Sequence, residues 1–152
     1  MASDAAFTVV IGYRQIAVFD LTLDAPFNHW TDLHIRQGFT WRPGSVSFRT
    51  VTHGGEVAVR VRVADHWSPL ANALAQIKVP FTVPLHGQVA VASIADERVL
   101  HVMPGEHQLI CEAVGGDILL TLVPQHTPTF HIHRVGPQAT SGEVLITTAD
   151  PA

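Results

Sequence analysis

Residues 56–64 read EVAVRVRVA and carry the clearest strand pattern in the chain. Four valines alternate with other residues, among them Arg60 and Arg62, so an extended backbone points the valines to one side and the arginines to the other. A sheet that is apolar on one face has to cover that face against another layer. The stretch therefore predicts a half-buried strand in a layered β-structure.

Similar short runs of β-branched and apolar residues recur on both sides of this stretch, separated by Gly and Pro. The expected strands are residues 7–13, 15–23, 46–52, 56–64, 76–83, 88–94, 99–103, 107–114, 117–123, 129–135 and 143–148. No strand–helix–strand spacing is present, so the pattern predicts an all-β protein. We expect a mainly antiparallel two-layer β-sandwich, or a flattened barrel, of about ten short strands. Residues 7–148 are expected to form this single domain, with flexible tails at 1–6 and 149–152.

Composition limits the class of protein further. The chain has 152 residues, of which 47% are hydrophobic and 14% charged, and this composition favours a folded domain. No apolar run approaches the roughly 18 residues that cross a bilayer, and the N-terminus lacks the features of a signal peptide. We therefore expect a cytoplasmic protein with no membrane partner. Cys111 is the single cysteine, which excludes an intramolecular disulfide, and its apolar flanks predict burial.

The net charge is −4 with neutral histidines, which argues against direct binding to nucleic acid. Ten histidines are present, and protonation of all of them would bring the net charge to +6 (−4 + 10 = 6). The surface charge is therefore expected to depend on pH near 6.

The stretch HWTDLHIRQGF, residues 29–39, departs from the β pattern and predicts one short helix near residues 29–38. Asn28 or Thr31 can cap its start, and Gly38 can end it in a left-handed conformation. A helix of this length does not persist alone in water, so the sandwich has to hold it. Three apolar residues do not fall on one stripe of this helix, so at least one must point away from whatever the others pack against: Trp30, Leu33 and Ile35.

The motif FHIH places His131 and His133 on one side of a strand and Phe130 and Ile132 on the other. Two imidazoles at this spacing are a frequent start of a metal site, so a metal-binding, cupin-like enzyme with a distant third ligand is one alternative. The Glu and Gly that a cupin motif places around such a pair are missing. Exposed neutral histidines opposite two core-facing residues are the second reading.

No other catalytic constellation stands out. None of the serines lies in a Gly-x-Ser-x-Gly motif, and the glycine pairs sit between strands rather than before helices, where they would bind phosphate. We therefore expect no enzyme activity and no cofactor. Trp30, Trp41 and Trp67 fall outside the expected strands, where they could stack on sugars as in a carbohydrate-binding module, or could plug the ends of the sandwich.

A series of short motifs follows along residues 11–114. They are Tyr13-Arg14-Gln15-Ile16-Ala17-Val18-Phe19, Trp30-Thr31-Asp32, Gly38, Ser47-Phe48, Val79-Pro80-Phe81, Gly87, Ser93-Ile94, Pro104-Gly105 and Gln108-Leu109-Ile110-Cys111. In their order and spacing these motifs resemble the competence protein J family, known for an inhibitor of the nuclease associated with DNA entry. The resemblance implies a non-enzymatic protein that binds and silences a nuclease. Outside competence systems, it implies an immunity protein against a nuclease toxin.

A protein partner of this kind suggests where to look for contact residues. A nuclease presents a positive cleft to DNA, so negative charge near aromatic anchors can compete for that cleft and raise the rate of association. A net charge of −4 is modest, and we expect shape and a few buried anchors to supply most of the affinity. The candidate partner-binding residues are Asp20, Asp24, Trp30, Asp32, Trp41 and Trp67. The sequence leaves the oligomeric state open.

Overall fold

The valine-rich stretch forms strand β5 (Gly55–Val63) in the computed structural model, which describes residues 3–137, 139 and 144–152. Val57, Val59 and Val61 are buried, whereas Arg60 on the opposite face is exposed. The alternation predicted from the sequence is confirmed, because each inward valine packs against a second sheet.

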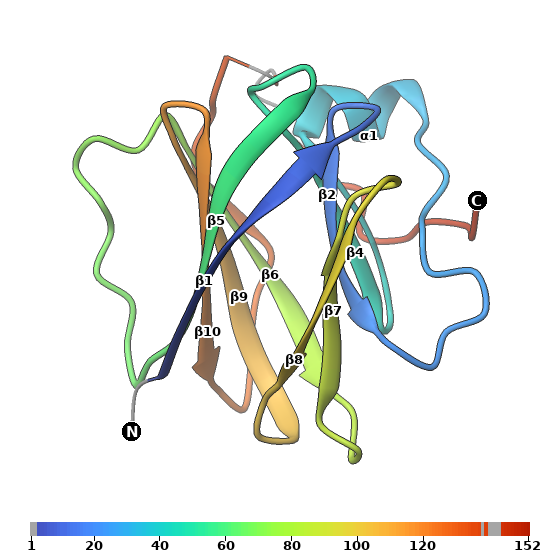
Figure 1. Ribbon diagram of the computed structural model, residues 1–152, viewed down its shortest axis with the longest axis vertical. Coiled ribbons are helices and arrows are strands. Elements are labelled where there is room, and N and C mark those ends of the chain that lie inside the picture. Colours follow the sequence, from blue (N-terminus) through green and yellow to red (C-terminus); the bar gives the residue numbers. More distant parts are fainter. Residues whose placement is uncertain (1–2, 138, 140–143) are drawn as a thin grey trace.

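Two sheets form the sandwich (Figure 1). The first, sheet A, has six strands in the order β1-β5-β10-β9-β6-β11. Their bounds are β1 Ser3–Ile11, β5 Gly55–Val63, β10 Asp117–Pro124, β9 Gly105–Val114, β6 Ala75–Val83 and β11 His131–Arg134. All neighbours in sheet A are antiparallel except β5 and β10, which pair in parallel.

The second, sheet B, has five antiparallel strands in the order β3-β4-β2-β7-β8. Their bounds are β3 Phe39–Arg42, β4 Ser45–Arg49, β2 Gln15–Asp20, β7 Gln88–Ala92 and β8 Glu97–His101. The two sheets are separate and do not close into a barrel, so the predicted all-β, mainly antiparallel two-layer sandwich is confirmed.

The main core lies between the two sheets. Sheet B contributes side chains such as Ile16 and Phe48, and sheet A contributes Val79 and Leu120, all almost completely buried. Full burial of each such side chain stabilises the fold by about 1.5–3 kcal/mol before entropy is counted. A smaller cluster around Phe19 lies on the outer face of sheet B, where it packs against apolar residues of the segment that follows β2.

The chain ends differ from the sequence prediction. Residues 3–6 of the tail predicted at 1–6 already belong to β1, which begins at Ser3 and pairs with β5, and residues 1–2 lie outside the described residues. At the other end, Pro151 forms an isolated bridge with Asn28, and His29 N donates to Asp150 O at 2.8 Å, so residues 150–152 are docked rather than loose. Backbone hydrogen bonds hold residues 3–6 and 150–152 against the rest of the chain, and the amino-acid composition of these segments does not predict such pairing.

Three further differences concern the elements. Strand β3 was not expected, because its four residues FTWR are too few for a recognisable alternation. A strand over residues 143–148 was expected. Residue 143 lies outside the described residues, and 144–148 carry no strand. Strand β11 is shorter than the expected 129–135. No helix in the described part of the chain has the length and apolarity to span a membrane.

Candidate functional site

Helix α1 (Asp32–Gln37) is shorter than the expected helix but has the expected caps. Thr31 is the N-cap, and its hydroxyl accepts a hydrogen bond from His34 N at 3.3 Å. His34 Nδ1 accepts in return from Thr31 N at 3.0 Å, which completes a capping box. Gly38 ends the helix with a φ of 89°, and its N–H donates to His34 O. Figure 1 shows α1 beside the turn that joins β1 and β2.

Polar side chains, rather than apolar ones, anchor this helix. His34 and Gln37 are buried, and both bind backbone from the end of the chain. His34 Nδ1 is an acceptor, so Nε2 carries the proton and donates to Thr148 O at 2.9 Å. Leu33 and Ile35 are 53% and 37% exposed. The prediction that at least one of Trp30, Leu33 and Ile35 points away from the sandwich is confirmed by the exposure of Leu33.

The turn between β1 and β2 is a second unusual feature. Tyr13 and Arg14 have φ values of 56° and 55°, the left-handed pair of a type I′ hairpin turn. Asn and Gly are the usual residues there, since a bulky side chain at positive φ costs on the order of 1 kcal/mol or more. Tyr13 is nevertheless 83% exposed. The turn therefore holds a large aromatic ring in solvent at some cost to stability.

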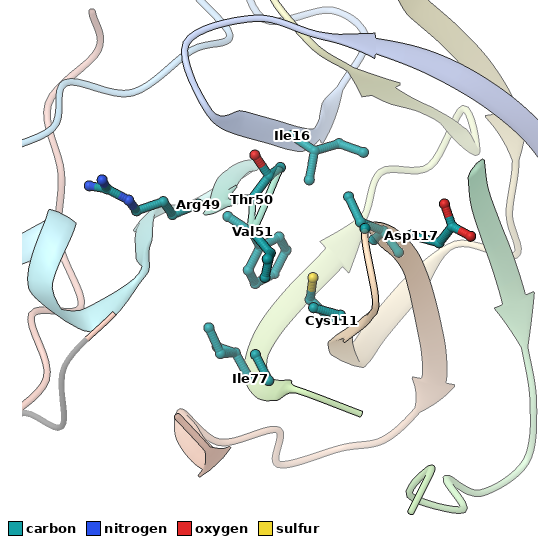
Figure 2. Close-up of a pocket in the computed structure, with 12 residues that line it drawn as sticks. Ile16, Arg49, Thr50, Val51, Ile77, Cys111 and Asp117 are labelled. Carbon is teal, nitrogen blue, oxygen red and sulfur yellow. The ribbon is translucent and has the colours of Figure 1, made fainter. Parts of the chain in front are cut away.

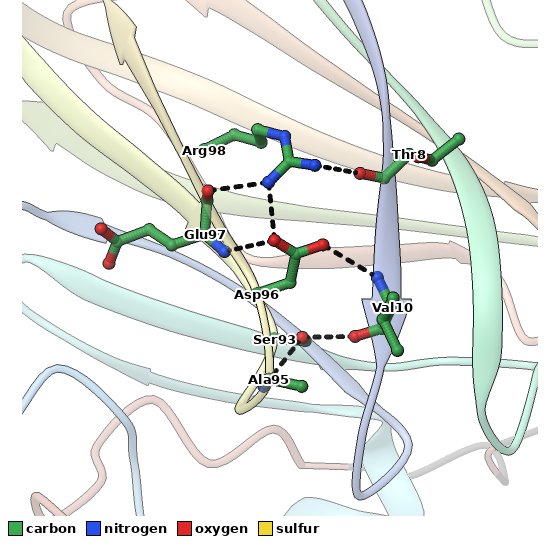
Figure 3. Close-up of polar contacts among 7 residues, drawn as sticks. All are labelled: Thr8, Val10, Ser93, Ala95, Asp96, Glu97 and Arg98. Atoms are coloured by element: carbon green, nitrogen blue, oxygen red, sulfur yellow. Dashed lines mark hydrogen bonds and ion pairs between the residues drawn. The ribbon is translucent and has the colours of Figure 1, made fainter.

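A set of polar contacts fixes this hairpin against sheet B (Figure 3). Asp96 Oδ2 accepts from Val10 N at 3.2 Å, and Ser93 Oγ donates to Val10 O. Arg98 donates to Thr8 O at 3.1 Å and to Asp96 Oδ1 at 2.6 Å. The hydrogen bond from Arg98, followed by that from Val10, holds the pKa of Asp96 below its ordinary value. Edge strand β1 is thus tied to the turn between β7 and β8.

These elements surround an open groove of about 450 Å³, called here the hairpin–helix groove. Trp30 and Gln15 form part of its wall, and Trp30 Nε1 donates to Gln15 Oε1 at 3.0 Å. Ile94, from the turn after β7, is 47% exposed at its edge. Exposed apolar groups collected at one place mark interaction sites. The residues that line the groove are Tyr13, Arg14, Gln15, Trp30, Ile35, Arg49 and Ile94.

Two arginines give the groove its charge. Thr50 N donates to Arg14 O at 2.8 Å, and Arg49 lies opposite Gln15 in the pairing of β2 with β4. Burial, and then the charge of Arg14, lower the pKa of Arg49 from its ordinary value. In the part of the chain that the structure describes, the Nε atoms of both arginines are buried without a hydrogen-bond partner, and no acidic side chain lines the groove.

A second, much smaller cavity lies inside the same end of the sandwich (Figure 2). Its free volume of about 10 Å³ holds at most one water molecule. Cys111 lines it, and burial, followed by the neighbouring Glu112, raises the pKa of this thiol well above its usual range. The prediction that Cys111 is buried is confirmed, and the shift keeps the thiol protonated and unreactive. Figure 2 shows the Arg49 side chain directed away from this cavity.

The three tryptophans lie in different settings. Trp30 lines the groove, whereas Trp41 lies in β3, contacts Phe130 with ring centroids 5.0 Å apart and donates to Pro80 O at 2.7 Å. Trp67 lies in the connection after β5, donates to Glu112 Oε1 at 3.0 Å and has its ring under the Lys78 ammonium. The structure does not bring the three rings together into one platform.

The candidate aspartates are also dispersed. Burial opposes ionisation of Asp20, but hydrogen bonds from Thr22 and His86 outweigh it and lower the pKa of Asp20. Asp24 is exposed in the segment after β2. Asp32 is exposed at the start of α1 and makes no ion pair with another described residue. Asp20 ends β2 at the far end of the strand from Gln15, which lines the groove, whereas Asp32 starts α1 three residues before the groove residue Ile35.

The FHIH motif has the predicted alternation. His131 and His133 are exposed with ring centroids 6.1 Å apart, while Phe130 and Ile132 pack against the core. Within residues 3–137, 139 and 144–152, no group of three or more His, Cys, Asp or Glu side chains is placed to hold a metal ion.

Sequence reasoning did not select Tyr13, Arg14, Arg49 or Ile94 as binding residues. One signal was available in the sequence. Tyr13 and Arg14 occupy the two central positions of a tight turn between two strand patterns, where Asn or Gly is usual, and the nearest glycine is Gly12, just before them. The meeting of Arg14 with Arg49 depends on the pairing of β2 with β4, which the sequence does not reveal.

Comparisons with known proteins identify one family and two solved structures that are similar to this chain. The family model of Competence protein J (ComJ) matches residues 8–121, which include every residue that lines the groove. The crystal structure of ComJ from Bacillus subtilis, an inhibitor of the DNA-degrading activity of NucA, is similar with a TM-score of 0.74 and 21% identity. The match covers 82% of this chain and 99% of that one.

A second solved structure, crocagin biosynthetic gene J, is similar with a TM-score of 0.62 and 17% identity, covering 83% of this chain and 99% of the other. At these identities the two structures show a shared fold. Among proteins of curated function, none matches this sequence.

Proposed function

The chain belongs to the competence protein J family, and we propose that it is a non-enzymatic inhibitor that binds and silences a partner nuclease. The observation that carries the proposal is the family match over residues 8–121. It is supported by a shared fold that spans 99% of ComJ, which is an inhibitor of the DNA-degrading activity of NucA.

The hairpin–helix groove is the surface that we propose for the nuclease. Tyr, Trp and Arg dominate the binding energy of protein interfaces, and the groove has Tyr13, Trp30 and two arginines. Hydrogen bonds hold α1 and the hairpin in place before binding, so little ordering entropy is lost on association. Partner binding also accounts for the cost of an exposed tyrosine in a left-handed turn.

Charge is proposed to guide the encounter rather than to supply the affinity. The net charge of −4 attracts a nuclease that carries a positive cleft, which raises the association rate. Asp32, exposed beside the groove on α1, is the acidic candidate best placed to take part. The dispersed positions of Asp20 and Asp24 argue against mimicry of a DNA backbone, which needs a continuous acidic track.

We place this inhibitor in the bacterial cytoplasm, where it protects cellular DNA from the nuclease. Two settings agree with the family: control of a competence nuclease, and immunity against a nuclease toxin. They differ in the gene that lies beside this one, because an immunity protein is inherited with its toxin.

Inhibition of a nuclease encoded in the same organism, taken first from the genes beside this one, tests the proposal. Purified full chain is expected to stop degradation of plasmid DNA at low salt once it reaches the molar concentration of the nuclease. An unrelated endonuclease, treated in the same way, should remain active. Failure to bind or inhibit the neighbouring nuclease would contradict the proposal. An electrophoretic shift of the DNA by the inhibitor alone would show instead that it shields the substrate.

A further inference from the structure

Arg14 and Arg49 place two positive charges in one groove, and no described acidic residue lines it. The charge of Arg14 contributes to the lowered pKa of Arg49, so the two guanidinium groups interact unfavourably. The ion pairs of the described residues include neither arginine. Because part of each side chain is buried, water compensates this repulsion only in part.

Three backbone features fix the positions of Arg14 and Arg49. Arg14 is held in the left-handed turn, and its carbonyl accepts from Thr50 N. Arg49 N donates to Gly38 O at the end of α1, 2.8 Å away. The pair is therefore a consequence of the fold at the junction of the hairpin, β4 and the helix, and is in place before any partner arrives.

The surroundings determine which anion suits this pair. Tyr13, Trp30, Ile35 and Ile94 make the groove walls largely apolar. In such surroundings the attraction between a carboxylate and a guanidinium is stronger than in water. The planar guanidinium can also donate two parallel hydrogen bonds to one carboxylate. Apolar walls on either side suit an aliphatic or aromatic side chain next to the acid.

We propose that the hairpin–helix groove binds an acidic segment of the partner nuclease, with one carboxylate between Arg14 and Arg49 and a neighbouring apolar side chain against Trp30 and Ile35. This rests on the proposed function, since it names the chemistry by which the nuclease is recognised. A phosphate of single-stranded DNA over the aromatic rings is the competing occupant. The net charge of −4 disfavours it.

Charge reversal in the groove tests the proposal with the full chain and the nuclease. Arg14→Glu changes a half-exposed side chain in the hairpin turn, and Arg60→Glu makes the same change in net charge on the outer face of β5. Arg60 pairs with Asp4 at 3.4 Å, but both are exposed and contribute little to stability. Arg14→Glu is expected to raise the inhibition constant by about tenfold or more, and Arg60→Glu by about threefold at most.

Arg49→Gln is the second variant, because it removes the charge and keeps a polar side chain. It should weaken inhibition in the same direction as Arg14→Glu, while thermal unfolding shows that each variant is folded. Equal inhibition constants for the wild type, Arg14→Glu and Arg49→Gln would overturn the proposal and leave the proposed function standing.

A measurement without the nuclease decides the chemistry of the groove by itself. The probes are the peptide Glu-Phe-Glu-Phe-Glu, the peptide Lys-Phe-Lys-Phe-Lys and a short single-stranded oligonucleotide, each followed through the indole N–H signal of Trp30 in a ¹⁵N correlation spectrum. The acidic peptide should shift this signal in the wild type and not in Arg14→Glu, and the basic peptide should shift it in neither. A stronger response to the oligonucleotide, or no response to the acidic peptide, would overturn the proposal. If the wild type fails to inhibit the nuclease, the proposed function falls, and the peptide result still decides the groove.

Discussion

Two regions that each contain a tryptophan differ in how far their polar and charged side chains are paired within the chain. In the connection after β5, Trp67 and Leu70 both donate to the fully buried carboxylate of Glu112. Gln76 adds a third hydrogen bond at 2.9 Å, and Lys78 lies over the Trp67 ring. The segment covers its own sheet and directs three donors to one buried carboxylate, with Gln76 Oε1 the one atom of this cluster that is buried without a hydrogen-bond partner among the described residues.

In the hairpin–helix groove, by contrast, the two arginines lack such pairing among the described residues, and several apolar side chains are exposed. Trp30 has one internal partner, but Tyr13, Ile35 and Ile94 are exposed. Arg14 and Arg49 have no opposing charge among the described residues. The difference teaches that an exposed aromatic residue does not by itself mark a binding surface. What distinguishes the groove is that its two arginines have no ion-pair partner among the described residues, while apolar side chains beside them are exposed.

The largest expected effect concerns the closed region. Glu112→Ala removes the acceptor of three hydrogen bonds at a buried site, and the unpaired donors should lower the free energy of unfolding by roughly 3 kcal/mol. Urea denaturation measures this loss. Inhibition of the nuclease by the folded fraction should be unchanged. A loss below about 1 kcal/mol would show that the Trp67 connection is not held by Glu112.

Tyr13→Asn should separate stability from binding in the open region. Asn tolerates the left-handed conformation, so relief of strain should raise the free energy of unfolding by about 0.5–1 kcal/mol. The same change removes an aromatic anchor, and binding to the nuclease should weaken by about 2 kcal/mol, or roughly 30-fold. Titration calorimetry and urea denaturation measure the two quantities. If stability falls while binding is retained, Tyr13 is a structural residue.

Gly38→Ala tests whether the end of α1 is adapted to its left-handed conformation. The φ of 89° strains any side chain, and an added Cβ would lie 3.1 Å from the Cβ of Ala139. We expect a loss of about 1–2 kcal/mol in the free energy of unfolding. Gly115→Ala is a matched control, because its φ is also positive but its added Cβ meets no neighbour. Equal losses at the two positions would show that crowding at Gly38 contributes nothing.

The smallest expected effect is a pH dependence that comes from His107 in the core-facing part of β9, outside the groove. Burial lowers the pKa of His107, although its hydrogen bond to Gly105 O opposes the shift. The unfolded chain therefore takes up a proton first, and stability should fall as the pH drops below about 6.5. His107→Gln should reduce this slope in urea denaturation at several pH values. No histidine lines the groove, so an unchanged slope would assign the effect to another of the ten histidines.

The sequence predicted most of the sandwich because strand alternation is a local property. The burial of alternate residues in β5 and the caps of α1 at Thr31 and Gly38 both depend on residues a few positions apart. The parallel pairing of β5 with β10 depends on segments about 60 residues apart, and no local pattern encodes it.

The site was predicted less well for the same reason. Trp30 and Asp32 were selected as candidates because the helix-like stretch is visible in the sequence. The inward position of His34 and Gln37 was not predicted, because both bind backbone of residues 146–148. The approach of Arg14 to Arg49 also needs the register of two strands. Residues that function through long-range neighbours are not visible as a motif.

Amide hydrogen exchange of the full chain, with and without the neighbouring nuclease, tests the central claim most directly. We predict that binding slows exchange in the hairpin turn at residues 12–15, in α1 and in the turn at residues 93–95. The connection at residues 64–74 should exchange at the same rate in both states. Protection of residues 64–74 with none at the hairpin turn would contradict the assignment of the groove as the nuclease-binding surface.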